Sequence, residues 1–215
     1  IGQRAYTDRM AAELQGAMAE WSAATGREVG LVSAYRTEDA REVLVAMGTI
    51  ADTAIAVVDH LRAQGRPVGC LAVTAFRPFP SAALIASILE ARAVAVVERT
   101  DDPLAAANPL TRELRAALYD AAAEGEMVPR VRSYVAGLGS RDVSAGDLVA
   151  VFDDLADRTD RPDAVRVLGI RHPLALVFPA LPPARGLGKL IEKLSPGRLR
   201  RGGCVAGGDM PIGMI

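Results

Sequence analysis

An uncharged run that ends at two prolines constrains the fold of this chain most strongly. Residues 70–76 carry no charge, and Arg77-Pro78-Phe79-Pro80 follows directly. Neither proline can donate to the hydrogen-bond ladder of a sheet, so the strand must end here. Because a strand that is apolar on both faces is typical of a helix-covered parallel sheet, we predict that this one lies in the middle of such a sheet. Its carboxyl end is the edge where ligands usually bind, although a rigid turn with no binding role is the alternative.

Strands and helices alternate along most of the chain. This order predicts an α/β fold, with a doubly wound, mostly parallel sheet and helices on both faces. We expect one domain over residues 1–158, and a tail or a linker towards a following domain over 159–215. Further expected elements are a helix over 7–25 capped by Thr7 or Asp8, strands at 29–35, 43–47, 68–76, 93–97 and 131–135, a helix opened by Pro109, a capping box of Ser144 and Asp147, and one more strand at 165–170.

Composition excludes several kinds of protein. The 25 basic and 26 acidic residues give a formal net charge of -1, which argues against a nucleic-acid partner. Cys70 and Cys204 cannot supply a cysteine framework or the ligands of a metal cluster, and such sparse use predicts a reducing cytoplasm. No apolar run reaches the roughly 18 residues of a membrane span, so we expect no membrane partner.

Two glycine turns each follow an expected strand. Gly48-Thr49 precedes a helix, where free backbone N–H groups can hold an anion. Gly137-Leu138-Gly139-Ser140 has the same placement at a later strand. The alternative for both is a tight turn that only glycine tolerates. They are therefore candidate anion or ligand turns, and no dinucleotide or Walker fingerprint accompanies them.

Titratable residues do not assemble into a catalytic set. His60 falls on an expected helix and His172 in the tail, and neither has an assignable acid and nucleophile beside it. Glu38 and Asp39 are neighbours in a loop, where helix capping explains them better than acid–base catalysis. The residues alone thus indicate an α/β domain with no complete active site, no catalytic residue and no metal site.

Six segments, taken in order, resemble a known family. They are similar to the transketolase C-terminal-like domain of pyruvate:ferredoxin oxidoreductases and related 2-oxoacid:acceptor oxidoreductases, over roughly residues 5–158. The segments are Gly26-Arg27, Tyr35-Arg36-Thr37-Glu38-Asp39-Ala40, Val45-Ala46-Met47-Gly48-Thr49, Arg77-Pro78-Phe79-Pro80, Glu98-Arg99-Thr100 and Gly137-Leu138-Gly139-Ser140.

The resemblance implies a large, usually dimeric cytoplasmic enzyme. Such an enzyme decarboxylates a 2-oxoacid on thiamine diphosphate with magnesium, passes electrons through iron–sulfur clusters to ferredoxin or flavodoxin, and forms acyl-CoA. In this family other domains build most of the thiamine site, so the resemblance implies a packing role for this one. We therefore expect no cofactor to bind this chain alone. The residues expected to meet other domains or subunits are Tyr35, Arg36, Thr37, Glu38, Asp39, Arg77, Pro78, Phe79, Pro80, Glu98 and Arg99.

One departure from the family pattern leaves the substrate open. Where the family usually has Lys-Glu-Pro-Gly, this chain has Asp101-Asp102-Pro103-Leu104, which reverses the charge of the loop. Two alternative functions remain: the equivalent domain of another thiamine-dependent enzyme of the transketolase or dehydrogenase type, and a module that binds coenzyme A through the glycine turns.

Overall fold

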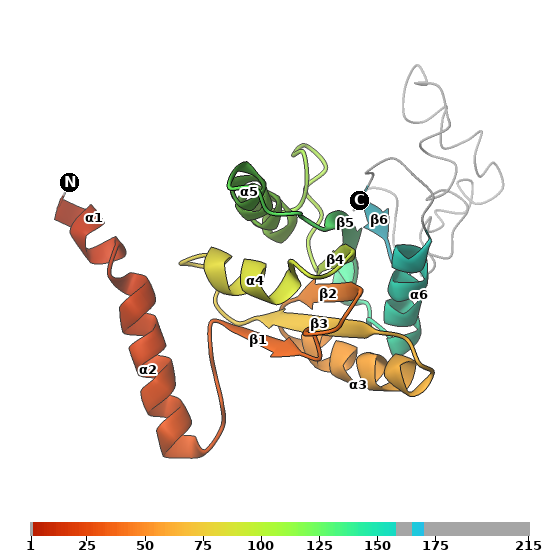
Figure 1. The fold of residues 1–215 in the computed structure, drawn as a ribbon, viewed down its shortest axis with the longest axis horizontal. Helices are drawn as coiled ribbons and strands as arrows, with labels where there is room; N and C mark the ends of the chain where they lie inside the picture. The colour runs from red at the N-terminus through yellow and green to blue at the C-terminus, as the bar shows by residue number, and fades with distance from the viewer. Residues whose placement is uncertain (1, 158–164, 170–215) are drawn as a thin grey trace, which may run out of the picture. The chain divides into compact units, whose positions relative to one another are not determined.

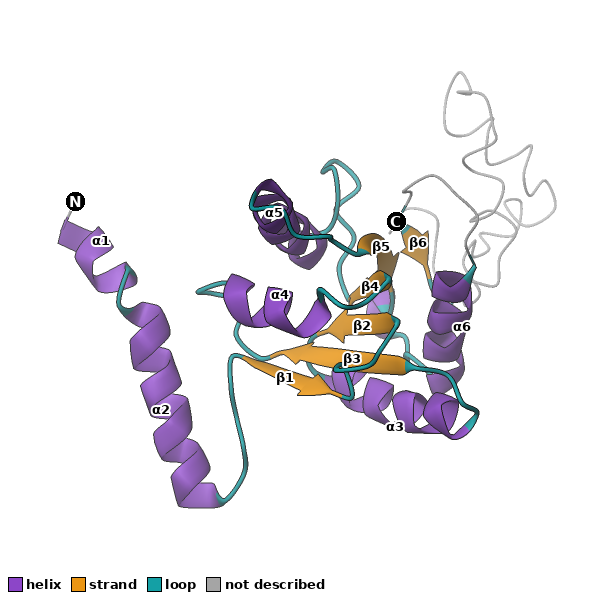
Figure 2. Ribbon diagram, viewed as in Figure 1, coloured by secondary structure: helices purple, strands orange, loops and turns teal. Residues whose placement is uncertain are grey.

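The computed structural model describes residues 2–157 and 165–169. Figure 1 shows a sheet with helices around it, and Figure 2 separates helices from strands. The elements are α1 (Gly2–Thr7), α2 (Met10–Thr25), β1 (Val32–Tyr35), β2 (Glu42–Ala46), α3 (Thr49–Ala63), β3 (Val68–Val73), α4 (Ser81–Ile88), β4 (Ala93–Glu98), α5 (Pro109–Ala123), β5 (Arg130–Val135), a 3-10 turn (Leu138–Ser140), α6 (Ala145–Ala156) and β6 (Arg166–Val167).

The sheet is mixed, with one antiparallel strand at its edge. Its order is β1-β3-β2-β4-β5-β6, and every neighbouring pair is parallel except β1 with β3. This confirms the expected mostly parallel α/β sheet. The uncharged strand β3 is an interior strand as expected, between β1 and β2, but it is second from the edge, and the central pair of the sheet is β2 and β4.

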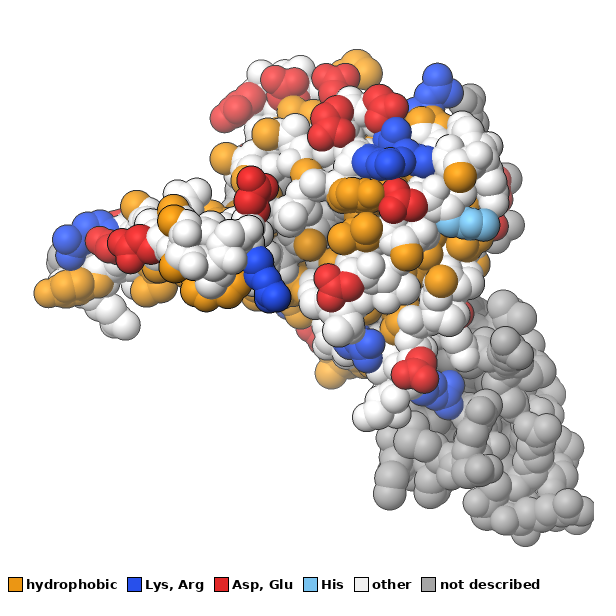
Figure 3. Space-filling model, turned by 90° about the horizontal axis from the view of Figure 1, so that it is seen from below, with side chains coloured by type: hydrophobic (Ala, Val, Ile, Leu, Met, Phe, Trp, Pro, Cys, Tyr) orange, Lys and Arg blue, Asp and Glu red, His pale blue; other side chains and the backbone are white. Residues whose placement is uncertain are grey.

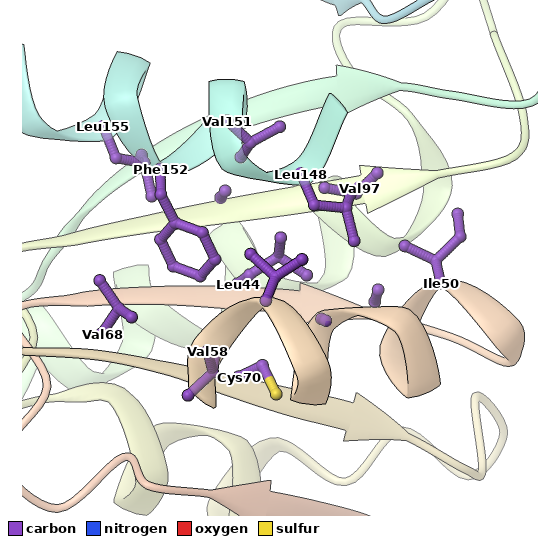
Figure 4. Packing of buried hydrophobic residues seen from close by; sticks show 14 of the residues in the cluster. Leu44, Ile50, Val58, Val68, Cys70, Val97, Leu148, Val151, Phe152 and Leu155 are labelled. Atoms are coloured by element: carbon purple, nitrogen blue, oxygen red, sulfur yellow. The ribbon is translucent and has the colours of Figure 1, made fainter. Parts of the chain in front are cut away.

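Each face of the sheet has its own core. Leu44 of β2 packs with α3 and α6 on one face, where Figure 4 shows Ile50 and Phe152 reaching towards the strands. Val43 and Val45 of the same strand pack with α4 and α5 on the other face. Alternate residues of β2 thus enter different cores. Every residue of the strand is therefore buried, and all are apolar except Glu42.

Several local signals are confirmed. Pro109 is the first residue of α5, and Ser144 and Asp147 form the capping box of α6. The uncharged strand ends earlier than expected, at Val73, because the N–H groups of Thr74 and Ala75 donate to Leu31 O.

The expected helix over 7–25 corresponds to α2, which begins three residues later, and a separate short helix, α1, precedes it. Arg9 is the N-cap of α2 and makes no side-chain capping bond, whereas Thr7 Oγ1 donates to Arg4 O. Gly26, in the left-handed conformation, ends α2 as expected. Neither α1 nor α2 contains a buried residue.

β6 falls within the strand expected at 165–170. The compact unit runs to Leu168 and so contains β6, which pairs with β5. The rest of the expected tail lies almost wholly outside the described residues. Within the described ranges, no helix has the length and apolar character needed to cross a membrane.

Candidate functional site

A cavity of about 510 Å³ opens at the carboxyl edge of the sheet. The chain connects β2 to β3 on one side and then crosses to β4 on the other, so β2 and β4 form the topological switch point where such sheets bind ligands. The cavity lies there. It is lined by Met47, Gly48, Ile50, Phe76, Val97, Glu98, Arg99, Thr100, Pro109 and Leu110.

Arg99 connects the two glycine turns at this edge. It follows β4 and is exposed, with Nη2 3.5 Å from Thr49 Oγ1 at the start of α3. A Cβ on Gly137 would lie 2.8 Å from Arg99 Nη1, and the φ of +71° at Gly137 also favours glycine. The candidate turns at Gly48-Thr49 and at Gly137–Ser140 are thus brought together around one guanidinium.

The Arg77–Pro80 corner lies at the same edge, after β3. Arg77 donates to Glu113 Oε1 of α5 at 2.6 Å, and its guanidinium carbon is 4.2 Å from the centre of the Phe76 ring. Phe76 and Phe79 pack edge to face, with their centres 6.1 Å apart, and Pro80 is buried. The Arg77-Pro78 peptide bond is cis. The side chains of the corner therefore pack against one another, and the Arg77–Glu113 ion pair connects the corner to α5.

The Glu98 side chain points into the domain. It is 7 % exposed, and its carboxylate accepts hydrogen bonds from Leu110 N at 2.7 Å, Thr111 N at 3.2 Å and Thr111 Oγ1 at 2.8 Å. Ser133 Oγ lies 3.0 Å from Thr111 Oγ1. The first N–H groups of a helix have no partner within the helix, and a carboxylate at the N-terminus can accept their hydrogen bonds. Glu98 therefore positions the start of α5 against β4.

The loop after β4, which contains the Asp101–Leu104 departure from the family pattern, is held by an ion pair. Asp102 lies 2.9 Å from Arg112 Nη1, and Asp102 N donates to the oxygen of the Asn108 side chain. Leu104, in contrast, is 99 % exposed. Asp101 is exposed as well, so this loop presents an acid and an apolar residue.

The expected docking residues 35–39 lie at the opposite edge of the sheet. Because β1 is antiparallel, Tyr35 pairs with Cys70 near the start of β3. Asp39 accepts from both terminal nitrogens of Arg62, at 2.6 and 3.1 Å, and Tyr35 Oη donates to Asp59 at 2.8 Å. The structure thus brings the candidates together as two groups, one at each edge.

We call residues 35–39 the amino-edge group, because they lie near the amino end of β3. Their contacts shift several pKa values. The hydrogen bond from Arg62 lowers the pKa of Asp39, and the same pair raises the pKa of the Arg62 guanidinium. The hydrogen bond to Asp59 raises the pKa of Tyr35. Arg36 lies 3.5 Å from Asp59, Thr37 is buried, and Glu38 is exposed.

Sequence reasoning missed the partners of these residues. Arg62 lies 23 residues after Asp39, and Glu113 lies 36 residues after Arg77. No helical or strand spacing relates residues so far apart, so only the fold brings them together. Thr111, whose hydroxyl donates to Glu98, likewise lies 13 residues after it and belongs to none of the motifs.

The described residues do not assemble a site for the magnesium or iron–sulfur groups that the resemblance implies for the whole enzyme. They contain no cluster of at least three His, Cys, Asp or Glu side chains that could hold a metal ion. Cys70, the cysteine within them, is buried, and desolvation raises the pKa of its thiol to about 12. Cys204 and His172 lie outside the described residues.

Comparison with known proteins identifies the family. The family described as "Pyruvate:ferredoxin oxidoreductase core domain II" matches residues 40–148, just over half of the chain. The chain belongs to this family. The matched region contains the carboxyl-edge cavity, Arg77, Arg99 and both glycine turns, whereas α1, α2 and β1 precede it.

Curated relatives of this oxidoreductase family are much longer than the matched segment. Pyruvate synthase subunit PorA of Thermotoga maritima is 37% identical over 71% of this chain, which spans 38% of that protein. Pyruvate-flavodoxin oxidoreductase of Klebsiella pneumoniae is 37% identical over 78% of the chain and only 14% of its own length. A solved 2-oxoglutarate:ferredoxin oxidoreductase from Magnetococcus marinus aligns with a TM-score of 0.46 and 15% identity, over 64% of this chain and 21% of that one.

Proposed function

We propose that this chain is a structural and docking domain of a thiamine-diphosphate-dependent 2-oxoacid:ferredoxin or flavodoxin oxidoreductase. The observation that carries the proposal is the family match over residues 40–148, which spans the carboxyl edge. The complete enzyme would oxidatively decarboxylate pyruvate, or a related 2-oxoacid, to acyl-CoA. Thiamine diphosphate, magnesium and iron–sulfur clusters would be held by other domains or subunits of a cytoplasmic, dimeric assembly.

The chemistry of the carboxyl edge favours docking over catalysis. The Glu98 carboxylate already accepts hydrogen bonds from Leu110 and Thr111 of α5, and Arg77 is paired with Glu113. The carboxyl-edge cavity is lined mainly by apolar side chains, with Arg99 among its exposed residues. A partner that inserts an apolar side chain and places a carboxylate near Arg99 would match this surface.

Arg77→Ala in the complete oxidoreductase tests the docking role. We expect the variant to assemble with a dissociation constant weaker by on the order of tenfold, because a charged anchor at an interface contributes more than 1 kcal/mol. The thiamine chemistry of the enzyme that still assembles should stay intact. Sedimentation over a range of concentrations measures assembly, and turnover per assembled enzyme measures the chemistry.

Glu113→Ala is the matched control for this test. It removes the same 2.6 Å ion pair between Arg77 and Glu113, but the corner keeps the positive charge of Arg77. We expect its assembly to stay close to wild type. Equal losses of assembly in the two variants would assign Arg77 an internal role only, and lost turnover in fully assembled Arg77→Ala enzyme would restore an active-site role.

The position of Arg99 favours a second candidate, in which this edge binds the phosphate groups of coenzyme A. The guanidinium lies between the start of α3 and the glycine turn after β5, where anions are readily held. Calorimetric titration of the chain with coenzyme A tests this role. Absence of binding heat at millimolar ligand would count against it.

A further inference from the structure

Helix α2 exposes an apolar seam that the described residues leave largely uncovered. None of its 16 residues is buried, and Met10 and Trp21 are 49% and 46% exposed. In Figure 3, hydrophobic side chains gather along one edge of the helical segment at the left. An isolated helix of this length is marginally stable in water, so its stability calls for a partner surface.

The seam has the spacing of a coiled coil. Met10, Leu14, Ala17, Trp21 and Ala24 recur at alternating steps of four and three residues. This is the a/d pattern of a heptad repeat, in which each side chain inserts between residues of a facing helix. Leu14 is half-buried and Ala17 is exposed, so the seam is accessible along its length.

The charges beside the seam indicate what kind of helix fits. In this register Glu13 and Glu20 both occupy the g position, and Ala11, Met18 and Thr25 occupy the e position. An antiparallel second copy of α2 would bring glutamate against glutamate, and a parallel copy would give the glutamates no cation. A facing helix with Lys or Arg beside its seam would complement both.

We propose that α2 docks through this seam against a basic amphipathic helix in the remainder of the oxidoreductase. The inference rests on the proposed function, because it places the partner in the rest of that enzyme. The chain spans only 38% and 14% of two curated relatives, so most of the surface of such an enzyme belongs to other segments. Residues 40–148 carry the family match, and α2 adds a second docking element before them.

Hydrogen–deuterium exchange of residues 10–25 tests the inference in the complete oxidoreductase and in the 215-residue chain. We expect exchange to be slower in the complete enzyme by about tenfold or more, since docking closes local opening of the helix. Leu14→Asp should abolish this protection. Ala12→Asp introduces the same residue on the opposite face and should retain it, whereas Glu13→Lys combined with Glu20→Lys should reduce it.

Two results would overturn the inference. The first is equal exchange of residues 10–25 in the chain and in an assembled, active enzyme; that result would leave the proposed function standing. The second is self-association of the chain alone that Leu14→Asp abolishes, because the partner would then be a second copy. Failure of the proposed function is distinguishable, since it would appear as absent 2-oxoacid oxidation in an assembly that still protects α2.

Discussion

At the scale of single residues, Gly69 is the glycine among the described residues whose Cβ would meet its neighbours most closely. A Cβ built there would lie 2.4 Å from Arg36 O, 3.0 Å from Arg36 C and 3.1 Å from Thr37 Cα. All three are backbone atoms of the loop that carries the amino-edge group. That loop therefore depends on a hydrogen atom in place of a side chain on β3.

We expect Gly69→Ala to lower the free energy of unfolding by about 1–3 kcal/mol, because the loop backbone must move to admit the methyl group. Gly146→Ala is the control, since its Cβ would meet Ser144 Oγ at an ordinary 3.7 Å. The control should be neutral or slightly stabilising. Urea denaturation of both variants decides, and equal stabilities would contradict the close approach.

The Asp39–Arg62 pair predicts a dependence of stability on pH. The pKa of Asp39 is lowered in the folded chain from an ordinary value of 3.8, so the unfolded chain binds more protons between the two values. The contribution of the pair is therefore complete above pH 3.8 and is lost as pH falls through the folded pKa.

Asp39→Asn removes this contribution. We expect the stability difference between wild type and variant to be largest near neutral pH and to shrink as the solution is acidified to about pH 3. Asp101→Asn, at an exposed loop position, removes one negative charge elsewhere and serves as the control. Denaturant titrations at stepped pH measure both, and a difference that grows on acidification would refute the assignment.

At the scale of elements, the Glu98 carboxylate joins β4 to the first turn of α5. Glu98→Gln keeps the shape but replaces one acceptor oxygen by an NH₂ donor that faces the N–H groups of α5. We expect a loss of about 1–3 kcal/mol in unfolding free energy and faster amide exchange at Leu110 and Thr111. Glu124→Gln, at the exposed far end of α5, should change neither quantity, and a Glu98 variant as stable as this control would contradict the account.

The elements show which features the sequence alone predicts. Pro109 and the Ser144–Asp147 capping box are local signals, and helices α5 and α6 begin at them as expected. The antiparallel pairing of β1 outside β3 was missed, because a short strand carries no mark of its direction or neighbour. The same limit applies to the candidate site: motifs marked Arg77, Arg99 and Asp39, whereas the partners Glu113 and Arg62 follow only from the fold.

At the scale of the whole molecule, the part of the chain that the structure describes presents two groups of expected docking residues and the exposed helix α2. The carboxyl edge carries the cavity and Arg99, the amino edge carries residues 35–39, and α2 carries the apolar seam. The ionic groups at the two edges are largely engaged within the domain. This supports the proposal that the domain shapes an assembly whose reacting groups belong to other domains.

Turnover of the complete oxidoreductase with Arg99→Ala tests this central claim most directly. The variant is assayed with saturating pyruvate, and coenzyme A is varied while the fraction of assembled enzyme is measured in the same sample. Our account predicts weaker assembly, with unchanged kcat and unchanged KM for coenzyme A per assembled enzyme. A fully assembled variant with lost turnover, or with a raised KM for coenzyme A, would contradict it.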